Sequence, residues 1–295
     1  MNLPGPVERL QSDTVNLTKR QFLKMTAGLG LGFGIPGSGA LAYAAGFEPH
    51  RVVAEHIPVR LTSLPAAFDG FRIALLSDFH LYPFTTIDIV QEAIQIANRF
   101  KPDLVLLAGD FIYGAVDAAF DLVPLFHQFD AGKGVFAVLG NHDVRKGPKI
   151  VAQALAKGGV ELLRNRGVTI QLGSDSIYLA GIDSVFAGSP RPKVAFDNRK
   201  SDLTSIVLLH EPDYIEDLVE SKIPVDLQLS GHSHGGQVRL PLGGPLLLPP
   251  WGQLYDRGLY RIENAQIYTT RGIGMVGVPV RFNCPPEVTC ITLTA

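Results

Sequence analysis

The sequence has 295 residues, of which 46% are hydrophobic and 18% charged, a composition that excludes a disordered chain and provides for a large buried core. The 26 basic and 28 acidic residues give a net charge of −2. Since there is no basic excess to neutralise phosphates, the composition argues against nucleic-acid binding. Two cysteines, Cys284 and Cys290, are too few for a disulfide scaffold or a cysteine-rich zinc site.

The N-terminal residues have the pattern of a targeting segment. Lys19, Arg20 and Lys24 precede an uncharged, glycine-rich stretch over residues 25–46, which ends in small residues. A positive region, an apolar region and a small-x-small motif are typical of a secretory signal peptide. Because a stable membrane-spanning helix needs ~20 strongly apolar residues, we favour a cleaved signal over residues 1–45, with an uncleaved membrane anchor as the alternative.

The block Thr18-Lys19-Arg20-Gln21-Phe22-Leu23-Lys24 resembles the twin-arginine export signal, Ser/Thr-Arg-Arg-x-Phe-Leu-Lys, with Lys19 in place of the first arginine. The resemblance implies that the twin-arginine export machinery carries the protein to the periplasm or the cell-envelope side of the membrane. The functional domain is then expected over residues 46–295.

Residues 47–295 have the pattern of one mixed α/β domain with two packed sheets. In the first half, apolar runs alternate with helical patterns, which predicts parallel strands with helices outside them. The expected strands there are 71–77, 103–108 and 134–139, and the expected helices are 86–100, 116–127 and 148–158. The second half has fewer helices, with strands expected at 168–172, 176–180, 205–209, 226–229, 266–270 and 287–293. Residues 241–255, rich in Pro and Gly, are expected to form an irregular apolar loop.

Polar blocks follow five of the expected strands. The blocks are Asp78-Phe79-His80, Gly109-Asp110, Gly140-Asn141-His142-Asp143, His210 and Gly231-His232-Ser233-His234. Loops at the carboxyl ends of strands in open α/β sheets line one crevice, so all five blocks can meet at one site. Carboxylate, imidazole and amide donors suit divalent transition metals such as Mn, Fe, Co, Ni or Zn, and a shared carboxylate can bridge two ions. A purely structural role is disfavoured, because such clusters are costly to bury without a partner.

In this order, Asp-x-His, Gly-Asp, Gly-Asn-His-Asp, a lone His and Gly-His-x-His resemble the motifs of the calcineurin-like metallophosphoesterase family, over roughly residues 50–295. The twin-arginine-like signal is similar to that of the exported bacterial branch of the family. The resemblance implies a four-layer α/β/β/α sandwich with two mixed sheets and two bound divalent transition-metal ions. It assigns Asp78, His80 and His234 to one ion, Asn141, His210 and His232 to the other, and Asp110 to both.

The same resemblance places His142 beside the metals, where it would hold the phosphoryl oxygen or protonate the leaving group. In the family an acidic residue often follows the bridging aspartate by three positions, and here that residue is Tyr113. Asp143 or a backbone carbonyl is therefore expected to orient His142. Arg271 and Arg281 could contact a substrate phosphate, with a surface salt bridge as an equal alternative.

The ligand set predicts hydrolysis of phosphodiester or pyrophosphate bonds, because two cations neutralise the phosphate and acidify a bound water. The resemblance extends to lipid-linked substrates of the cell envelope, such as UDP-2,3-diacylglucosamine of lipid A biosynthesis, and to association with the membrane. One alternative is a general phosphodiesterase of soluble nucleotides. Another is a binding scaffold without activity, which the complete ligand set disfavours.

Overall fold

The computed structural model describes residues 39–295, so the twin-arginine-like block lies outside the described residues. The chain divides into two units, Met1–Ala40 and Leu41–Ala295, and every strand described below belongs to the second. Residues 41–46 are helical and lead into a short 3-10 helix, η1 (Glu48–His50). None of the described helices is both long and apolar enough to cross a membrane.

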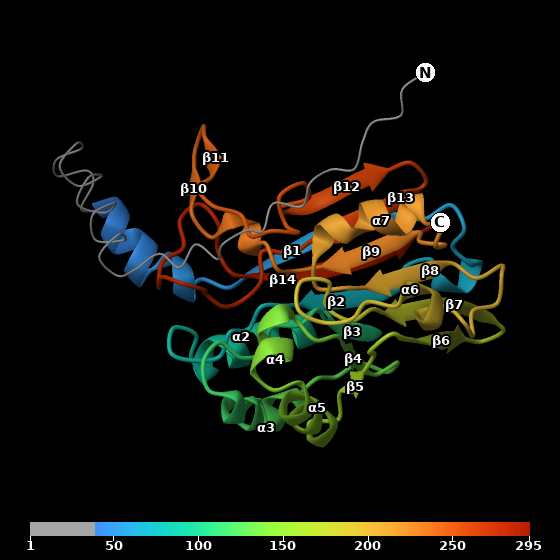
Figure 1. Ribbon diagram of the computed structural model, residues 1–295, viewed down its shortest axis with the longest axis horizontal. Helices are drawn as coiled ribbons and strands as arrows, with labels where there is room; N and C mark the ends of the chain where they lie inside the picture. Colours follow the sequence, from blue (N-terminus) through green and yellow to red (C-terminus); the bar gives the residue numbers. More distant parts are fainter. Residues whose placement is uncertain (1–38) are drawn as a thin grey trace. The chain divides into compact units, whose positions relative to one another are not determined.

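Two six-stranded sheets lie at the centre of the second unit (Figure 1). In spatial order, the first sheet consists of β1 (Val53–Arg60), β14 (Glu287–Thr294), β2 (Arg72–Leu76), β3 (Leu104–Leu107), β4 (Val135–Ala137) and β5 (Glu161–Leu162). The second consists of β12 (Gly258–Ile262), β13 (Ala265–Thr269), β9 (Leu227–Ser230), β8 (Ser205–Leu208), β7 (Asp175–Gly181) and β6 (Arg166–Leu172).

Both sheets are mixed. From β2 to β5 the strands of the first sheet run parallel, while β14 pairs antiparallel with β2 and parallel with β1. In the second sheet β13, β9, β8 and β7 run parallel, and the edge strands β12 and β6 are antiparallel to their neighbours. The parallel strands of each sheet therefore end at one common edge, where the functional loops begin.

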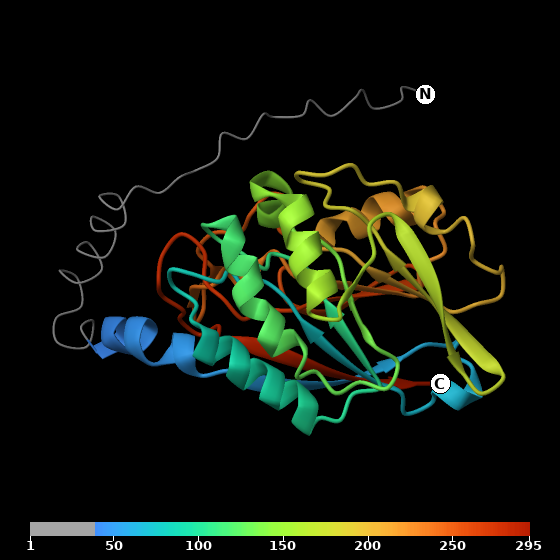
Figure 2. The same ribbon diagram turned by 90° about the horizontal axis from the view of Figure 1, so that it is seen from below.

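Helices cover the outer face of each sheet (Figures 1 and 2). The helices on the first sheet are α2 (Ile87–Arg99), α3 (Val123–Phe126), α4 (Asn141–Lys146) and α5 (Pro148–Lys157), and those on the second are α6 (Pro192–Ala195) and α7 (Ile215–Glu220). In β2, Ala74 and Leu76 pack toward the helices, whereas Ile73 and Leu75 join the core between the sheets. This alternation produces the four layers α/β/β/α that the family resemblance implied.

The hydrophobic periodicity of the sequence correctly located most helices and strands of the core. All the expected strands are present with ends shifted by at most two residues, and the helices expected at 86–100 and 148–158 are α2 and α5. The helix expected at 116–127 is instead a 3-10 helix, η3 (Val116–Leu122), followed by the single turn α3. Pro124 lies in the first turn of α3 and lacks the N–H that would continue an α-helical ladder from η3.

Several elements were not expected from the sequence. They are β1, β5, β12, α4, α7 and the 3-10 helices η2 (Ala66–Phe68), η4 (Pro212–Tyr214) and η5 (His234–Gly236). The stretch 241–255 is not wholly irregular either, since β10 (Arg239–Leu240) and β11 (Gly244–Pro245) form a small antiparallel hairpin within and before it. Apart from β1, which has eight residues, these pieces are too short to produce a readable hydrophobic period.

Candidate metal centre

The five polar blocks meet at the carboxyl ends of β2, β3 and β4 in the first sheet and of β8 and β9 in the second. Three overlapping clusters have ligand atoms that lie within 4.8 Å of one another: Asp78–His80–His234, His80–Asp110–His142 and Asp110–His210–His232. Asn141, the eighth predicted residue, is buried beside His142 at the start of α4. The structure thus brings the whole predicted set into one site between the two sheets.

The backbone at this site is unusual. Five of the residues have φ values in the left-handed region, namely Asp78 (54°), His80 (42°), Asp110 (56°), His232 (71°) and His234 (53°). Residues other than glycine rarely adopt this conformation, and each instance costs about 1–3 kcal/mol. Such backbone strain is concentrated at functional sites, where it fixes the direction of side chains at the end of a strand.

Two glycines allow the loops to approach one another. A Cβ atom at Gly140 would lie 2.1 Å from Oδ1 of Asp110, and a Cβ at Gly231 would lie 2.3 Å from Oδ2 of Asp78. No side chain fits at these distances. Steric contacts therefore explain why the Gly-Asn-His-Asp block and the Gly-His-x-His block each begin with glycine. The carboxylates are thereby held against the backbone of the neighbouring loop.

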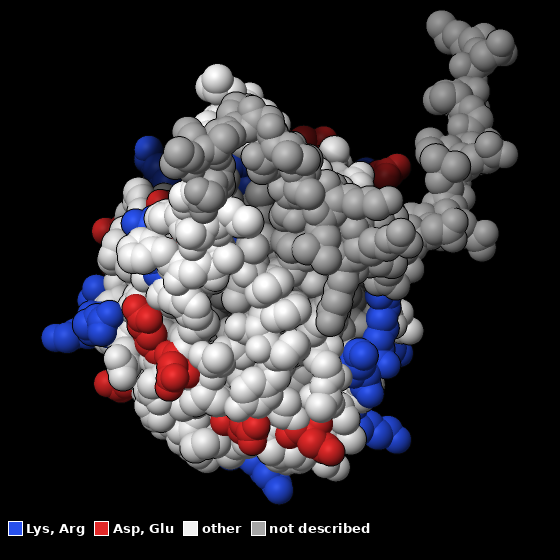
Figure 3. Space-filling model, turned by 90° about the vertical axis from the view of Figure 1, so that its left-hand side faces the viewer, with Lys and Arg blue, Asp and Glu red and all other residues white. Residues whose placement is uncertain are grey.

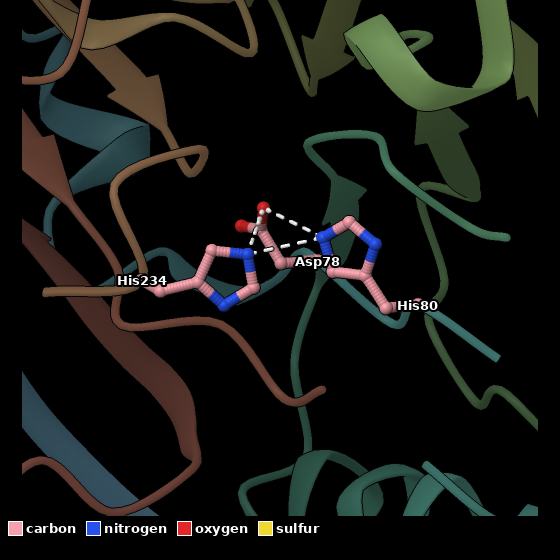
Figure 4. A group of neighbouring side chains, drawn as sticks. All are labelled: Asp78, His80 and His234. Carbon is pink, nitrogen blue, oxygen red and sulfur yellow. Dashed lines mark hydrogen bonds and ion pairs between the residues drawn. The ribbon is translucent and has the colours of Figure 1, made fainter. Parts of the chain in front are cut away.

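Asp78, His80 and His234 form the first cluster (Figure 4). The Nε2 atoms of His80 and His234 are 3.0 Å apart, and Oδ1 of Asp78 lies 3.3 Å from Nε2 of His234 and 3.7 Å from Nε2 of His80. All three side chains are buried. Two imidazole nitrogens and a carboxylate oxygen that face one point are arranged as ligands of a single cation.

Asp110, His210 and His232 form the second cluster, and hydrogen bonds to carbonyl groups fix the imidazole tautomers. Nδ1 of His210 lies 2.6 Å from the carbonyl oxygen of Ala108, and Nε2 of His232 lies 2.8 Å from that of Pro250. Because a carbonyl oxygen can only accept, these nitrogens carry the protons. When the rings are neutral, the lone pairs are therefore on Nε2 of His210 and Nδ1 of His232, as metal-binding imidazoles require.

Buried polar atoms without a partner test whether metal ions fit these residues. Among residues 39–295, Oδ1 of Asn141, Nε2 of His210 and Nδ1 of His80 and His234 are buried and form no hydrogen bond. Leaving such atoms unpaired costs about 1–3 kcal/mol each. Cations in the two clusters would satisfy the lone pairs of Asn141 and His210, so the donor set fits bound metal.

Electrostatics favours the protonation states of metal ligands at most of these groups. Burial alone would raise the pKa of Asp110, but the neighbouring histidines, His210 foremost and then His142 and His80, together outweigh burial and hold the pKa well below its ordinary value. The pKa of Asp78 is held low against burial in the same way, chiefly by His234. Burial lowers the pKa values of His234 and His232 and keeps both neutral. His210 differs, since Asp110 overcomes burial and raises its pKa, so that a bound cation would displace its proton.

Asp143 supports the loops and does not orient His142. Its buried carboxylate accepts the backbone N–H groups of Asp110 (2.8 Å), Phe111 (2.9 Å) and Gly140 (3.0 Å). The expectation that this carboxylate is the partner of the imidazole is therefore wrong. Asp143 instead ties the loop after β3 to the loop after β4.

Tyr113 occupies the position beside His142. The two rings stack with centroids 5.5 Å apart and an angle of 25° between their planes, and the Tyr113 hydroxyl accepts the backbone N–H of Gly277 (3.2 Å). The backbone N–H of His142 donates to Oδ1 of Asp110 (2.8 Å). Burial lowers the pKa of His142 to about 4, which leaves a neutral ring that can donate one N–H.

The side chains of the two arginines named as candidate phosphate contacts are bound by neighbouring groups of the protein. Arg281 is fully buried and donates to backbone carbonyls of the 271–284 loop, among them those of Arg271 and Cys284 (2.9 Å each). Arg271 forms ion pairs with Glu55 (2.9 Å) and Glu287 (2.7 Å). Both arginines therefore stabilise the loop. Arg271 forms the salt bridge expected as the alternative, with the partly exposed Glu55, whereas the buried Arg281 binds backbone carbonyls instead.

One side of the centre is lined by residues that sequence reasoning did not single out. The ring of Phe186 lies 6.0 Å from that of His232, and the guanidinium of Arg145 lies 4.3 Å above the Phe186 ring. Buried Glu211 holds this loop by accepting the backbone N–H groups of Val185 (3.0 Å) and Phe186 (3.3 Å). Glu211, the acidic residue directly after His210, is the sequence signal that could have indicated that the Phe186 loop lines the centre.

A four-layer α/β fold with a histidine, carboxylate and amide centre at the strand ends defines a metallohydrolase. Residues 71–236 match the model of the calcineurin-like phosphoesterase family. The chain is 35% identical to the uncharacterized metallophosphoesterase YkuE of Bacillus subtilis over 94% of this chain and 98% of that one. It is 32% identical to the phosphodiesterase YaeI of Escherichia coli, over 94% and 99% of the two chains.

The chain therefore belongs to the calcineurin-like phosphoesterase family and is a hydrolase of phosphoester bonds. A more distant relative is the UDP-2,3-diacylglucosamine pyrophosphatase LpxG of Chlamydia muridarum, 27% identical over 84% of this chain and 91% of that one. The family uses a dinuclear metal centre, and the clusters around Asp110 could bind metal ions.

Gly231→Ala tests the steric basis of the first cluster. The new methyl group would collide with Oδ2 of Asp78 and with Oγ of Ser77, which would lie 2.1 Å away. We expect the variant to fold with a loss of about 1–3 kcal/mol and to bind less metal by elemental analysis. Gly132→Ala, whose Cβ would meet no atom within 4 Å, is the control and should keep its metal. Full metal content in Gly231→Ala would contradict the steric argument.

Proposed function

We propose that the protein is a dinuclear metal-dependent phosphohydrolase that cleaves phosphodiester or pyrophosphate bonds. The observation that carries the proposal is the position of one oxygen atom. Oδ2 of Asp110 lies 3.4 Å from Nε2 of His80 and 3.2 Å from Nε2 of His210, so it faces a ligand of each cluster. A carboxylate in this position is suited to bridge two ions.

Asp78, His80 and His234 would hold one ion, and Asn141, His210 and His232 the other, with Asp110 shared. When bound, the two ions neutralise the phosphate charge and lower the pKa of a bound water. Nitrogen and oxygen donors without thiolates favour Mn, Fe, Co, Ni or Zn. His142 would donate its N–H to a phosphoryl oxygen or pass a proton to the leaving group.

For the substrate we propose a phosphodiester or pyrophosphate of envelope lipids, such as UDP-2,3-diacylglucosamine. The name of LpxG supports this class, since that relative is a pyrophosphatase of this lipid. The half-buried Phe186 and the exposed Arg145 beside the second cluster offer an apolar face and a positive charge to a leaving group. The second candidate is a phosphodiesterase of soluble nucleotides, and the name of YaeI supports the phosphodiesterase activity without naming a substrate.

We further propose that the protein is exported by the twin-arginine route and stays attached to the membrane through an uncleaved N-terminus. Packing around the small-x-small motif supports retention. Ala44 is buried, its carbonyl oxygen accepts the backbone N–H of Arg281 (2.9 Å), and the ring of Tyr43 lies 6.5 Å from that of Phe282. Cleavage after Ala44 would remove these contacts from the domain.

Metal analysis with an activity assay tests the dinuclear proposal. The purified protein should carry close to two transition-metal ions and hydrolyse bis(p-nitrophenyl) phosphate. Asp110→Ala should lose both ions and nearly all activity, because one carboxylate serves both clusters. Asp117→Ala removes an exposed carboxylate from η3 and is the control. Loss of a single ion from Asp110→Ala would show that Asp110 is not the bridge.

His142→Ala separates catalysis from metal binding. The variant should keep its metal and lose about 10²–10⁴-fold in turnover, the usual contribution of general acid–base assistance. If His142 protonates the leaving group, the loss should be larger for alkyl esters than for nitrophenyl esters, which leave without a proton. His127→Ala removes an exposed histidine and serves as the control. Equal losses on both esters would assign His142 to the phosphoryl oxygen, and loss of metal would make it a ligand.

Fractionation with mass spectrometry tests export and retention. The full-length protein should appear in the membrane fraction on the exported side with residues 1–44 present. Replacing both Lys19 and Arg20 with Gln should block export, whereas Arg9→Gln, ahead of the block, should not. A soluble exported protein that begins at Ala45 would refute retention, and export of the double variant would refute the twin-arginine route.

A further inference from the structure

Exposed apolar side chains gather at one end of the catalytic unit. On the hairpin of β10 and β11, the side chain of Leu242 is fully exposed and those of Leu240 and Leu247 are 43% and 57% exposed. In the N-terminal helical segment, Phe47 is 57% and Leu41 47% exposed. Large apolar side chains that are exposed together at one end of a domain indicate an interaction site.

Both the hairpin and the helical segment contact Phe282, and both lie at the same end of the catalytic unit (Figure 1). The carbonyl oxygen of Phe282 accepts the backbone N–H of Arg239 in β10 (2.9 Å), and its ring lies 6.5 Å from that of Tyr43. Viewed directly, the centre of this end carries few charged residues, and both signs of charge lie around it (Figure 3). We call this surface the apolar end.

We propose that the apolar end docks on a lipid bilayer, with the β10–β11 hairpin inserted among the lipids at its tip. This docking surface is a property of the folded domain and goes beyond the hydrolysis proposed above. The partner is a lipid surface rather than a second protein because the hairpin presents a protruding tip, whereas a stable dimer needs about 800 Å² of flat, complementary surface on each copy.

The composition of the hairpin suits lipid. Between Leu240 and Leu247 it contains no charged residue, and Pro241 and Pro245 have no N–H groups that would need a partner away from water. The charged residue at its base, Arg239, is neutralised by an ion pair with Asp256 and by a hydrogen bond to a backbone carbonyl. Inserting the tip therefore removes apolar area from water without burying a free charge.

The sequence that precedes the apolar end also favours a lipid partner. Residues 25–38, which precede the described helical segment, contain no charged residue, and Lys19, Arg20 and Lys24 lie just before them. An uncharged stretch that follows basic residues is suited to a bilayer with anionic headgroups. In the sequence, an uncharged stretch therefore directly precedes the helical segment of the apolar end.

A hydrogen-bonded path links the apolar end to the metal centre. Gln237, just before β10, accepts the N–H of Val276 (2.9 Å) and donates to the carbonyls of Val276 (3.1 Å) and Val278 (3.0 Å). Gly277 in the same loop donates to the hydroxyl of Tyr113, whose ring stacks on His142. A docked bilayer would therefore lie beside the loop that borders the catalytic histidine, where a lipid phosphoester could reach the centre.

Site-directed fluorescence tests the docking. The two native cysteines are buried, so a probe reacts selectively with an introduced surface cysteine. Full-length Leu242→Cys is labelled with the environment-sensitive dye NBD and mixed with vesicles of phosphatidylethanolamine and phosphatidylglycerol. We expect a blue shift, a several-fold rise in emission and quenching by lipids that carry a nitroxide in the acyl chain. Labelled Leu247→Cys should respond less, because it lies nearer the base of the hairpin.

The matched control is Ser174→Cys, in the exposed turn between β6 and β7, which lies at the opposite end of the catalytic unit (Figure 1). Its label should stay in water while flotation shows the protein on the vesicles. Docking is overturned if the protein floats but the label at 242 responds like the one at 174, or if no protein floats. It is also overturned if the label at 242 is already shielded without vesicles in a protein that is dimeric by light scattering. Hydrolysis of a soluble phosphodiester, measured on the same samples, separates failure of docking from failure of the proposed function, because Leu242 lies outside the metal centre.

Discussion

The position of the Asp110 carboxylate is the constraint on which the site depends. Its Oδ2 atom faces His80, from the first sheet, and His210, from the second. Its Oδ1 atom accepts the backbone N–H of His142, and its own N–H is bound by Asp143. Each hydrogen-bonding group of this residue thus has a separate neighbour, so a rotation of the side chain would break the contact with both clusters together.

Holding two ligand clusters at the meeting point of two sheets requires the sheets themselves to be fixed. The inter-sheet core does this with fully buried side chains from both sheets, such as Leu106 of β3 and Leu208 of β8. Close packing of this kind resists small displacements. The strained backbone of Asp78, Asp110 and His234 can persist because the surrounding packing and hydrogen bonds determine it. Stability in the core is therefore what keeps the ligand atoms at their spacing.

The sequence predicted which polar residues meet at the strand ends better than it predicted the surroundings of these residues, for a physical reason. A buried parallel strand is a run of apolar residues, and the polar residue that ends it is visible in the sequence. By contrast, some contacts around these residues join parts of the chain that are far apart in sequence. Tyr113 stacks on His142, and Glu211 accepts the backbone N–H of Phe186. No local pattern reports such contacts, which is why the role expected of Asp143 was wrong although its position in the motif was recognised.

Strand β1 shows the same limit within the fold. Its residues alternate between half-buried and exposed along most of its length, and Pro58 interrupts the apolar pattern, as is typical of an edge strand. The strand forms because β14 provides a parallel partner over its whole length, from Val53 to Arg60. A pairing between the two ends of a long sequence is a tertiary event, and the short-range signal for β1 is correspondingly weak.

The aromatic neighbour of His142 has a consequence for the chemistry of the site. A carboxylate at position 113 would stabilise a protonated imidazole, but it would also add a negative charge close to an anionic phosphate. Tyr113 fixes the plane of the ring by stacking and carries no charge, while its hydroxyl is engaged by Gly277. The ring is therefore oriented by packing instead of by an ion pair. In such an arrangement the orientation of His142 depends on the 275–280 loop, and so on the same segment that joins the metal centre to the apolar end.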